Sequence, residues 1–183
     1  MLEYLKYLVQ LLLSPARGWE DISAKSPDPE EMTRKGLYPL IGIAAVSEFC
    51  AFFYLKGLKL DQVLVRAVLD FGTYFVSVFI AKLIYEIYLG KVIDGGEPNP
   101  RKTASLTVFP LGLMVLLQIV ENCLQANLTF LKFLPLYVIL VLYKAIPYMG
   151  VKPNDELRFT GIASVATVVV PLAIYYLLDL IVF

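Results

Sequence analysis

One stretch of the chain, residues 37–55, most limits what this protein can fold into. It holds nineteen residues, and Glu48 is the only one with a formal charge. At a helical rise of about 1.5 Å per residue it spans roughly 28 Å, close to the hydrocarbon thickness of a bilayer. Its Leu, Ile, Val and Phe residues favour insertion by about 3 to 5 kcal/mol, whereas a central acid opposes insertion by about 3 kcal/mol. We therefore predict a transmembrane helix whose acid is protonated or has a partner on another helix.

The composition extends this prediction to the whole chain. Of 183 residues, 58% are apolar, and the mean hydropathy is +0.70. These values predict an all-α, polytopic membrane protein. The sixteen basic and sixteen acidic residues balance, so the chain lacks the basic excess that a nucleic-acid partner requires. The sequence has no histidine, which removes the common Ser-His and Cys-His pairs and the commonest metal ligand. We expect neither enzymatic activity nor a cofactor.

Residues 1–36 precede the first predicted span and carry a different pattern. In residues 1–13, the polar side chains Glu3, Lys6 and Gln10 fall within a narrow arc of a helix, with leucines and a valine opposite. This pattern is typical of an amphipathic helix that lies in the membrane interface. A signal peptide is the alternative, but the acid near the start and the poor cleavage site at residues 14–16 argue against it.

Residues 14–36 contain two helix-start signals, at Ser14-Pro15 and Asp28-Pro29. We expect a polar helical hairpin that lies against the membrane and ends near Gly36. Trp19, the only tryptophan, is predicted to anchor this segment at the level of the lipid headgroups.

Four more apolar segments follow, so the second unit, residues 37–183, is predicted to cross the membrane five times, at about 37–55, 62–89, 106–125, 130–149 and 160–183. Proline precedes leucine in four of these spans, which predicts kinks. Cys50 and Cys123 both fall inside spans, where a small apolar thiol is the ordinary interpretation, and a disulfide between them remains open.

Polar residues inside the spans are the candidate functional residues. Six of them are expected in the middle or outer part of the spans: Glu48, Arg66, Asp70, Gln118, Glu121 and Asp179. One hypothesis is a polar cavity centred on Glu48 that binds a proton or a cation, as in a small transporter or channel. The alternative is a structural network in which Glu48 pairs with Arg66 or hydrogen-bonds Gln118. Lys82 and Glu86, four residues apart, are predicted to form an ion pair at the inner end of the second span.

The basic residues predict the orientation. With the N-terminus in the cytoplasm, the inner segments hold twelve Lys and Arg residues and the outer segments hold four. Positively charged residues concentrate on the cytoplasmic side of membrane proteins. We therefore predict a multi-pass protein of the cell membrane, with a cytoplasmic N-terminus and an outside C-terminus.

Several short motifs, taken in order, resemble the bacterial branch of the Yip domain family (Ypt-interacting proteins). They are Ser-Pro-Ala-Arg-Gly-Trp-Glu-Asp-Ile at 14–22, Tyr38-Pro39-Leu40, Gly95-Gly96, Thr107-Val108-Phe109-Pro110, and the segment 143–149 with the loop and helix after it. The resemblance covers nearly the whole chain. It implies a five-span helical membrane protein and supplies no catalytic residues.

The resemblance also implies a role in organising membranes, as a scaffold or in trafficking. Eukaryotic members of the family are associated with Rab GTPases through a long cytosolic N-terminal region that carries an Asp-Leu-Tyr-Gly-Pro motif. This sequence has only about 36 residues before its first span and lacks that motif, so we do not expect a GTPase partner. The expected partners are the lipid bilayer and, by self-association or otherwise, another membrane protein.

Overall fold

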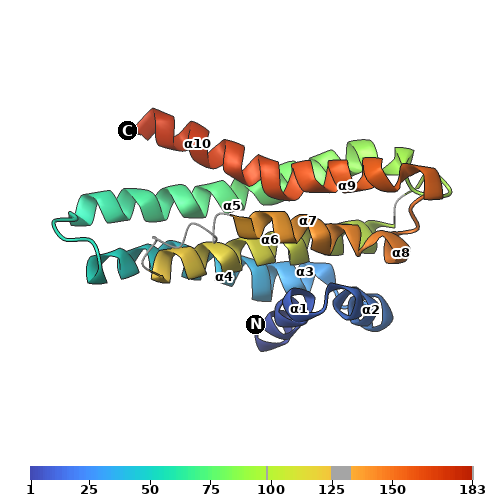
Figure 1. Ribbon diagram of the computed structural model, residues 1–183, viewed down its shortest axis with the longest axis horizontal. Helices are drawn as coiled ribbons and strands as arrows, with labels where there is room; N and C mark the ends of the chain where they lie inside the picture. The colour runs from blue at the N-terminus through green and yellow to red at the C-terminus, as the bar shows by residue number, and fades with distance from the viewer. Residues whose placement is uncertain (98, 125–132, 183) are drawn as a thin grey trace.

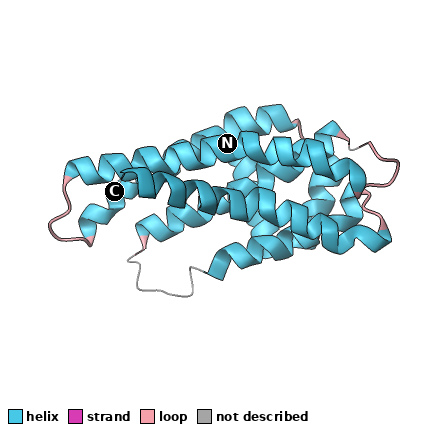
Figure 2. Ribbon diagram, turned by 90° about the horizontal axis from the view of Figure 1, so that it is seen from above, coloured by secondary structure: helices cyan, strands magenta, loops and turns pink. Residues whose placement is uncertain are grey.

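The computed structural model describes residues 1–97, 99–124 and 133–182, and helices are the only regular elements in these ranges (Figures 1 and 2). Four helical rods are long and apolar enough to cross a membrane: Pro29–Phe53, Leu60–Lys91, Pro100–Cys123 and Pro153–Ile181. Their most apolar windows have mean hydropathies of 1.6 to 2.0. The prediction of an all-α, polytopic membrane protein is confirmed at this level.

One rod is a single helix, one is a helix extended by a 3₁₀ turn, and two are composite. The second rod is α5 (Leu60–Tyr88) with the 3₁₀ turn η3 (Leu89–Lys91), and the third is α6 (Pro100–Cys123). The first rod joins α3 (Pro29–Met32), η1 (Thr33–Leu37), α4 (Tyr38–Ser47) and η2 (Glu48–Phe53). The fourth joins η5 (Pro153–Asp155), α9 (Glu156–Ser164), η6 (Val165–Val169) and α10 (Val170–Val182).

The first rod begins earlier than predicted. We expected Gly36 and Pro39 to end or bend the preceding segment, and the helix continues through both residues. The proline lies in the first turn of α4, where its missing N–H is harmless, and the π-helical turn η1 precedes it. The predicted boundary at residue 36 therefore falls inside a continuous rod.

The same arrangement occurs at Pro171 in the fourth rod. There the π-helical turn η6 ends two residues before the proline, as η1 does before Pro39, and in each turn a backbone N–H reaches a carbonyl five residues back. Pro110 instead lies inside the regular helix α6. Two of the prolines from which kinks were predicted thus follow π-helical turns, which are among the recognised sites of helix kinks.

The predicted span at 130–149 is different in the structure. Residues 130–132 lie outside the described ranges, and the helix that follows, α7 (Leu134–Tyr143), has ten residues. At about 1.5 Å per residue it covers roughly 15 Å, half of a bilayer core. A turn at Lys144 and Ala145 separates it from the short helix α8 (Ile146–Met149), which carries a proline in its first turn. The described chain thus has four helices of spanning length rather than five.

The bundle has two distinct ends. Figure 1 shows the C-terminus of α10 at the same end as the connection between the first rod and α5, with α8 and the start of α9 at the other end. At that other end the two loops join, since Ile93 and Val151 form an isolated antiparallel bridge. Asp94 N–H donates to Gly150 O at 2.9 Å, and Lys152 N–H donates to Val92 O at 3.0 Å.

The first two helices, α1 (Leu2–Leu13) and α2 (Pro15–Lys25), pack under the bundle near α3 (Figure 1). We call this helix pair the platform. Helix α1 was predicted to turn its apolar face to the membrane, but it buries Tyr4, Tyr7, Leu8 and Leu11 against α2, α6 and η1. A second apolar strip, with Leu2, Val9 and Leu13, stays exposed. The apolar side of α1 is thus divided between the bundle and the outside.

Candidate functional site

The polar side chains of the first three rods meet around Asn122, near the C-terminal end of α6. The side-chain amide of Asn122 donates to Asp70 Oδ2 at 3.2 Å and to Ser47 Oγ at 3.0 Å. Its Oδ1 accepts a hydrogen bond from Gln118 Nε2, one turn earlier on α6, at 2.9 Å. One amide therefore joins α4, α5 and α6, and we call this set, together with Glu48, the Asn122 cluster.

Two carboxyl groups belong to the cluster. Asp70 on α5 is 1% exposed, and Glu48, at the point where α4 tightens into the 3₁₀ turn η2, is 9% exposed. The two side chains interact directly with each other. Like charges in a poorly solvated site repel each other, so the contact between two acids sets the cluster apart from an ordinary hydrogen-bond network.

Arg66 is the basic residue whose charge acts on this pair, and it does so from a distance. It lies one turn before Asp70 on α5, and its side chain is exposed. Within the described ranges, no carboxylate oxygen lies within 4.0 Å of the guanidinium group. The predicted Glu48 to Arg66 ion pair is therefore absent there. The predicted Glu48 to Gln118 hydrogen bond is absent too, since Gln118 bonds Asn122 instead.

Tyrosine hydroxyl groups border the cluster. Tyr54 Oη donates to the backbone carbonyl of Asn122 at 2.8 Å. Tyr74 Oη lies 3.4 Å from both Gln118 Oε1 and Met114 O, so its bonds are long. Tyr175 on α10 lies within electrostatic range of Asp70, Glu48 and Asp179. The fourth rod thus also approaches the cluster.

The other predicted cluster residues lie further out. Glu121 is partly buried on α6, and Asp179 is partly buried on α10. Asn122 was not among the candidates, which on α6 were Gln118 and Glu121. The signal was available, since Asn122 follows Gln118 by four residues and two polar residues at that spacing share a helix face.

The predicted Lys82 to Glu86 ion pair is not formed. In the parts of the chain that the structure describes, the ion pairs are Lys25 to Asp21, Lys35 to Glu31 and Arg158 to Asp155, all within single helices or turns and at the surface. Lys82 is partly buried and Glu86 is exposed. The i, i+4 spacing permits such a pair but does not require it, because an exposed pair gains little over solvation.

Trp19 also differs from the prediction. It is 0% exposed, and its Nε1 donates to Val141 O of α7 at 2.8 Å. Rather than reaching the headgroups, it fixes α2 to the bundle. A tryptophan is readily buried when its N–H has a hydrogen-bond acceptor. Amphipathic periodicity alone does not reveal whether the fold supplies such an acceptor.

Three tyrosine hydroxyls attach the platform in the same way. Tyr4 donates to Val108 O at 2.8 Å, Tyr137 donates to Leu12 O at 2.6 Å, and Tyr148 donates to Ala16 O at 3.3 Å. Burial raises the pKa of the Tyr4 phenol well above its usual range, so this hydroxyl keeps its proton and stays a donor. Gly112 of α6 makes room for the ring, because a Cβ there would overlap the Tyr4 hydroxyl.

The two cysteines lie together beside the Asn122 cluster. Cys50 of η2 and Cys123 of α6 have their Sγ atoms 3.3 Å apart, and both are free thiols. The structure thus leaves the disulfide unformed but places both partners side by side. Cys123 follows Asn122 directly in the chain, so a bond here would also tie the cluster.

A metal site is not evident in the described ranges, where no group of three or more Cys, Asp or Glu side chains is arranged to hold an ion. The carboxyl, amide and hydroxyl groups of the cluster offer hydrogen bonding across three rods. In the comparisons with known proteins, no family model, no curated protein and no solved structure matches the chain.

Proposed function

We propose that this protein is a non-enzymatic membrane-organising protein of the Yip-like type, which binds the inner leaflet of the cell membrane through its platform. The order of short motifs along the sequence supports the family, and the excess of basic residues in the inner segments supports a cytoplasmic platform. The C-terminus of α10 lies at the end of the bundle away from the joined loops at Ile93 and Val151 (Figure 1), so with these loops in the cytoplasm it faces the outside.

One observation carries the proposal: the platform is fixed to the bundle on one side and apolar on the other. Its outer side has an open groove of about 530 Å³, lined by Leu2, Leu5, Val9 and Leu13 together with Lys6 and Arg17. Leu2 and Leu13 are 78% and 79% exposed. Apolar side chains edged by basic ones suit the boundary between anionic headgroups and acyl chains.

The occupant of this groove is therefore the anionic lipid of the inner leaflet. Because the platform is held by Trp19 and the tyrosines, an inserted α1 would transmit its position in the leaflet to the whole bundle. A helix held at this depth in one leaflet only is sensitive to lipid packing and curvature, which is the property that a membrane-organising protein needs.

The test places a nitroxide spin label at Val9→Cys in full-length protein with Cys50 and Cys123 replaced by serine, reconstituted in vesicles that contain phosphatidylglycerol. We expect oxygen, which partitions into lipid, to relax the label more than a water-soluble nickel complex does. The matched control is a label at Leu157, which is 86% exposed in the first turn of α9, just after the turn η5. A label at position 9 that responds mainly to the nickel complex would exclude the leaflet as the occupant.

A second candidate function rests on the carboxyl pair of the Asn122 cluster. Two interacting acids inside a membrane-spanning bundle can bind and release a proton, so the protein is alternatively a small proton-linked transporter or channel in which Glu48 and Asp70 share the proton. Their direct interaction is the observation that favours it.

Proteoliposomes that contain a pH-sensitive dye separate the two candidates. In a transporter, an imposed proton gradient drives flux in the parent protein, and Asp70→Asn and Glu48→Gln abolish it while Glu86→Gln does not. Glu86 is a suitable control because it is an exposed acid on the same helix as Asp70. A parent protein without flux, or a flux that survives both cluster substitutions, would remove the transport role.

A further inference from the structure

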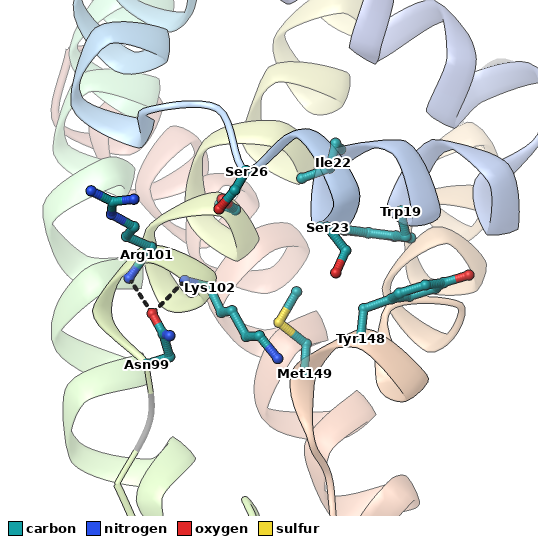
Figure 3. Close-up of a pocket in the computed structure, with 10 residues that line it drawn as sticks. Trp19, Ile22, Ser23, Ser26, Asn99, Arg101, Lys102, Tyr148 and Met149 are labelled. Atoms are coloured by element: carbon teal, nitrogen blue, oxygen red, sulfur yellow. Dashed lines mark hydrogen bonds between the residues drawn. The ribbon is translucent and has the colours of Figure 1, made fainter.

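A second cavity lies between the platform and the bundle, and neither candidate function uses it. It measures about 220 Å³ and is lined by residues of α2, of the start of α6 and of α8 (Figure 3). Trp19, Ile22, Met149 and the Tyr148 ring supply apolar walls. At about 30 Å³ for a water molecule in the liquid, this volume suits a phosphate-sized group with some water.

The polar lining of this cavity is cationic and hydroxylic. Arg101 and Lys102 contribute the charge, Ser23, Ser26 and Ser105 contribute hydroxyl groups, and the lining residues that the structure describes include no Asp or Glu. Neither cation has a carboxylate within 4.0 Å in the described ranges. Such a lining favours an anion and disfavours a cation.

Ser105 gives the most direct indication that a ligand belongs here. It lies one turn into α6 and is only 7% exposed, and the structure gives its hydroxyl no hydrogen-bond partner in the described chain. Thr107, two residues on, bonds the carbonyl one turn back. A hydroxyl that faces a cavity without a protein partner is free to donate to a bound acceptor.

The start of α6 adds a favourable field. Asn99 caps the helix by accepting from the N–H groups of Arg101 and Lys102, at 2.9 Å and 3.5 Å. The positive end of the helix dipole of a 24-residue helix therefore lies at the cavity, beside the two cationic side chains. In Figure 3 the Lys102 side chain reaches toward Met149, whereas the Arg101 guanidinium turns away from Tyr148.

We propose that this cavity binds a phosphate group, held by Lys102 and Ser105 with Arg101 at the rim. The phosphate belongs either to the headgroup of an anionic lipid or to a free phosphate ion, since both present the same oxygen acceptors. The proposal does not depend on the leaflet-binding groove or on the carboxyl pair, because it shares no residue with either.

The experiment measures binding to full-length protein in mild detergent. Inorganic phosphate is titrated by calorimetry, and retention of added phosphatidic acid or phosphatidylcholine is measured by native mass spectrometry. Lys102→Gln is compared with Lys144→Gln, an exposed lysine on the turn after α7, and Ser105→Ala is compared with Ser23→Ala.

We expect Lys102→Gln to weaken binding of the phosphate-bearing ligand about tenfold or more, as the loss of a charge-assisted hydrogen bond does. Lys144→Gln should leave binding unchanged, and Ser105→Ala should weaken it more than Ser23→Ala. Binding of both inorganic phosphate and phosphatidic acid identifies the phosphate group alone as the ligand. Retention of phosphatidic acid without binding of inorganic phosphate identifies a lipid headgroup. Binding of neither probe, or equal loss in the Lys102 and Lys144 variants, would overturn the proposal. Equal melting temperatures of all four variants show that the fold is retained.

Discussion

The platform junction and the Asn122 cluster both join segments that are far apart in the chain, but they do so with different chemistry. At the platform junction, neutral aromatic N–H and O–H groups donate to backbone carbonyls across separations of 104 to 132 residues. In the Asn122 cluster, one amide donates to a carboxyl group 52 residues away and to a hydroxyl group 75 residues away, and a second carboxyl group lies beside them. The first junction is formed by neutral groups alone, whereas the second contains two carboxyl groups.

This difference indicates what each region can do. A neutral aromatic donor to a carbonyl holds its geometry at any physiological pH, which suits a fixed attachment. Buried carboxyl groups in a polar network are sensitive to the loss of any one hydrogen-bond partner, so their geometry and stability depend on their surroundings. We therefore regard the platform junction as architecture and the Asn122 cluster as the place where the bundle can respond.

The largest expected effect is at the platform junction. Trp19→Ala removes a fully buried ring and leaves the Val141 carbonyl without its donor, so we expect a loss of about 3 to 5 kcal/mol of stability. Thermal unfolding followed by circular dichroism in mild detergent measures this loss. Tyr176→Ala, which removes an aromatic ring that is 68% exposed, is the control and should change stability little. Equal losses in the two variants would contradict a fixed attachment.

The next effect concerns the cysteine pair beside the cluster. Copper phenanthroline should oxidise Cys50 and Cys123 to a disulfide, with both thiol hydrogens lost and the electrons passed to the copper, because the sulfur atoms are 3.3 Å apart. Closing a loop of this length should stabilise the protein by about 2 to 4 kcal/mol.

Intact mass and a non-reducing gel shift report the cysteine bond, and Cys50→Ser is the control that cannot form it. If both thiols can still be alkylated after oxidation, η2 and the end of α6 are not held together as the structure shows. The contacts beside the Asn122 cluster are then less rigid than the platform junction.

A smaller loss is expected from Asn122→Leu. It removes the donor to Asp70 and Ser47 and leaves a buried acid with fewer partners, which should cost about 1 to 3 kcal/mol. The exposed Asn154→Leu is the matched control. If Asp70→Asn added to Asn122→Leu restores the lost stability in the same melting assay, the acid is the source of the cost. An unchanged melting temperature in Asn122→Leu would mean that the hydrogen bonds of Asn122 do not contribute to stability.

The two regions can also be compared by making the same substitution, Tyr to Phe, once in each region. Tyr4→Phe removes a hydrogen bond of 2.8 Å at the platform junction, and Tyr74→Phe removes bonds of 3.4 Å at the cluster. We expect a loss of about 1 kcal/mol for Tyr4 and less for Tyr74, because long bonds contribute little. The reverse order in urea titrations of the reconstituted protein would undo the distinction between the regions.

The smallest effect is predicted for the pair that does not form. Lys82→Gln and Glu86→Gln should each change stability by less than about 0.5 kcal/mol, and the double substitution should show no coupling. A double-mutant cycle on the melting data gives the coupling, and a value well above that limit would show that the two side chains meet in solution.

Much of the fold was accessible from local patterns. The apolar stretch around Glu48, the long segment before Tyr88 and the last segment of the chain were all recognised as helices able to span a membrane. The segment at 130–149 was overestimated, because the turn at Lys144 interrupts an apolar stretch that hydropathy reads as continuous. The candidate site was found in part: Glu48, Asp70 and Gln118 were named and do lie together, but the residue that connects three of the rods was not.

The amino-acid sequence by itself determined that the chain forms apolar helices, because the lengths and the lack of charge are local properties and a backbone in lipid must satisfy its own hydrogen bonds. Tertiary structure alone decided which polar groups meet. Trp19 is buried rather than interfacial because an acceptor from residue 141 lies beside it, and Asp70 pairs with Asn122 rather than Arg66 because α6 packs against α5 at that height. Such contacts join residues tens of positions apart, and no periodicity along the chain encodes them.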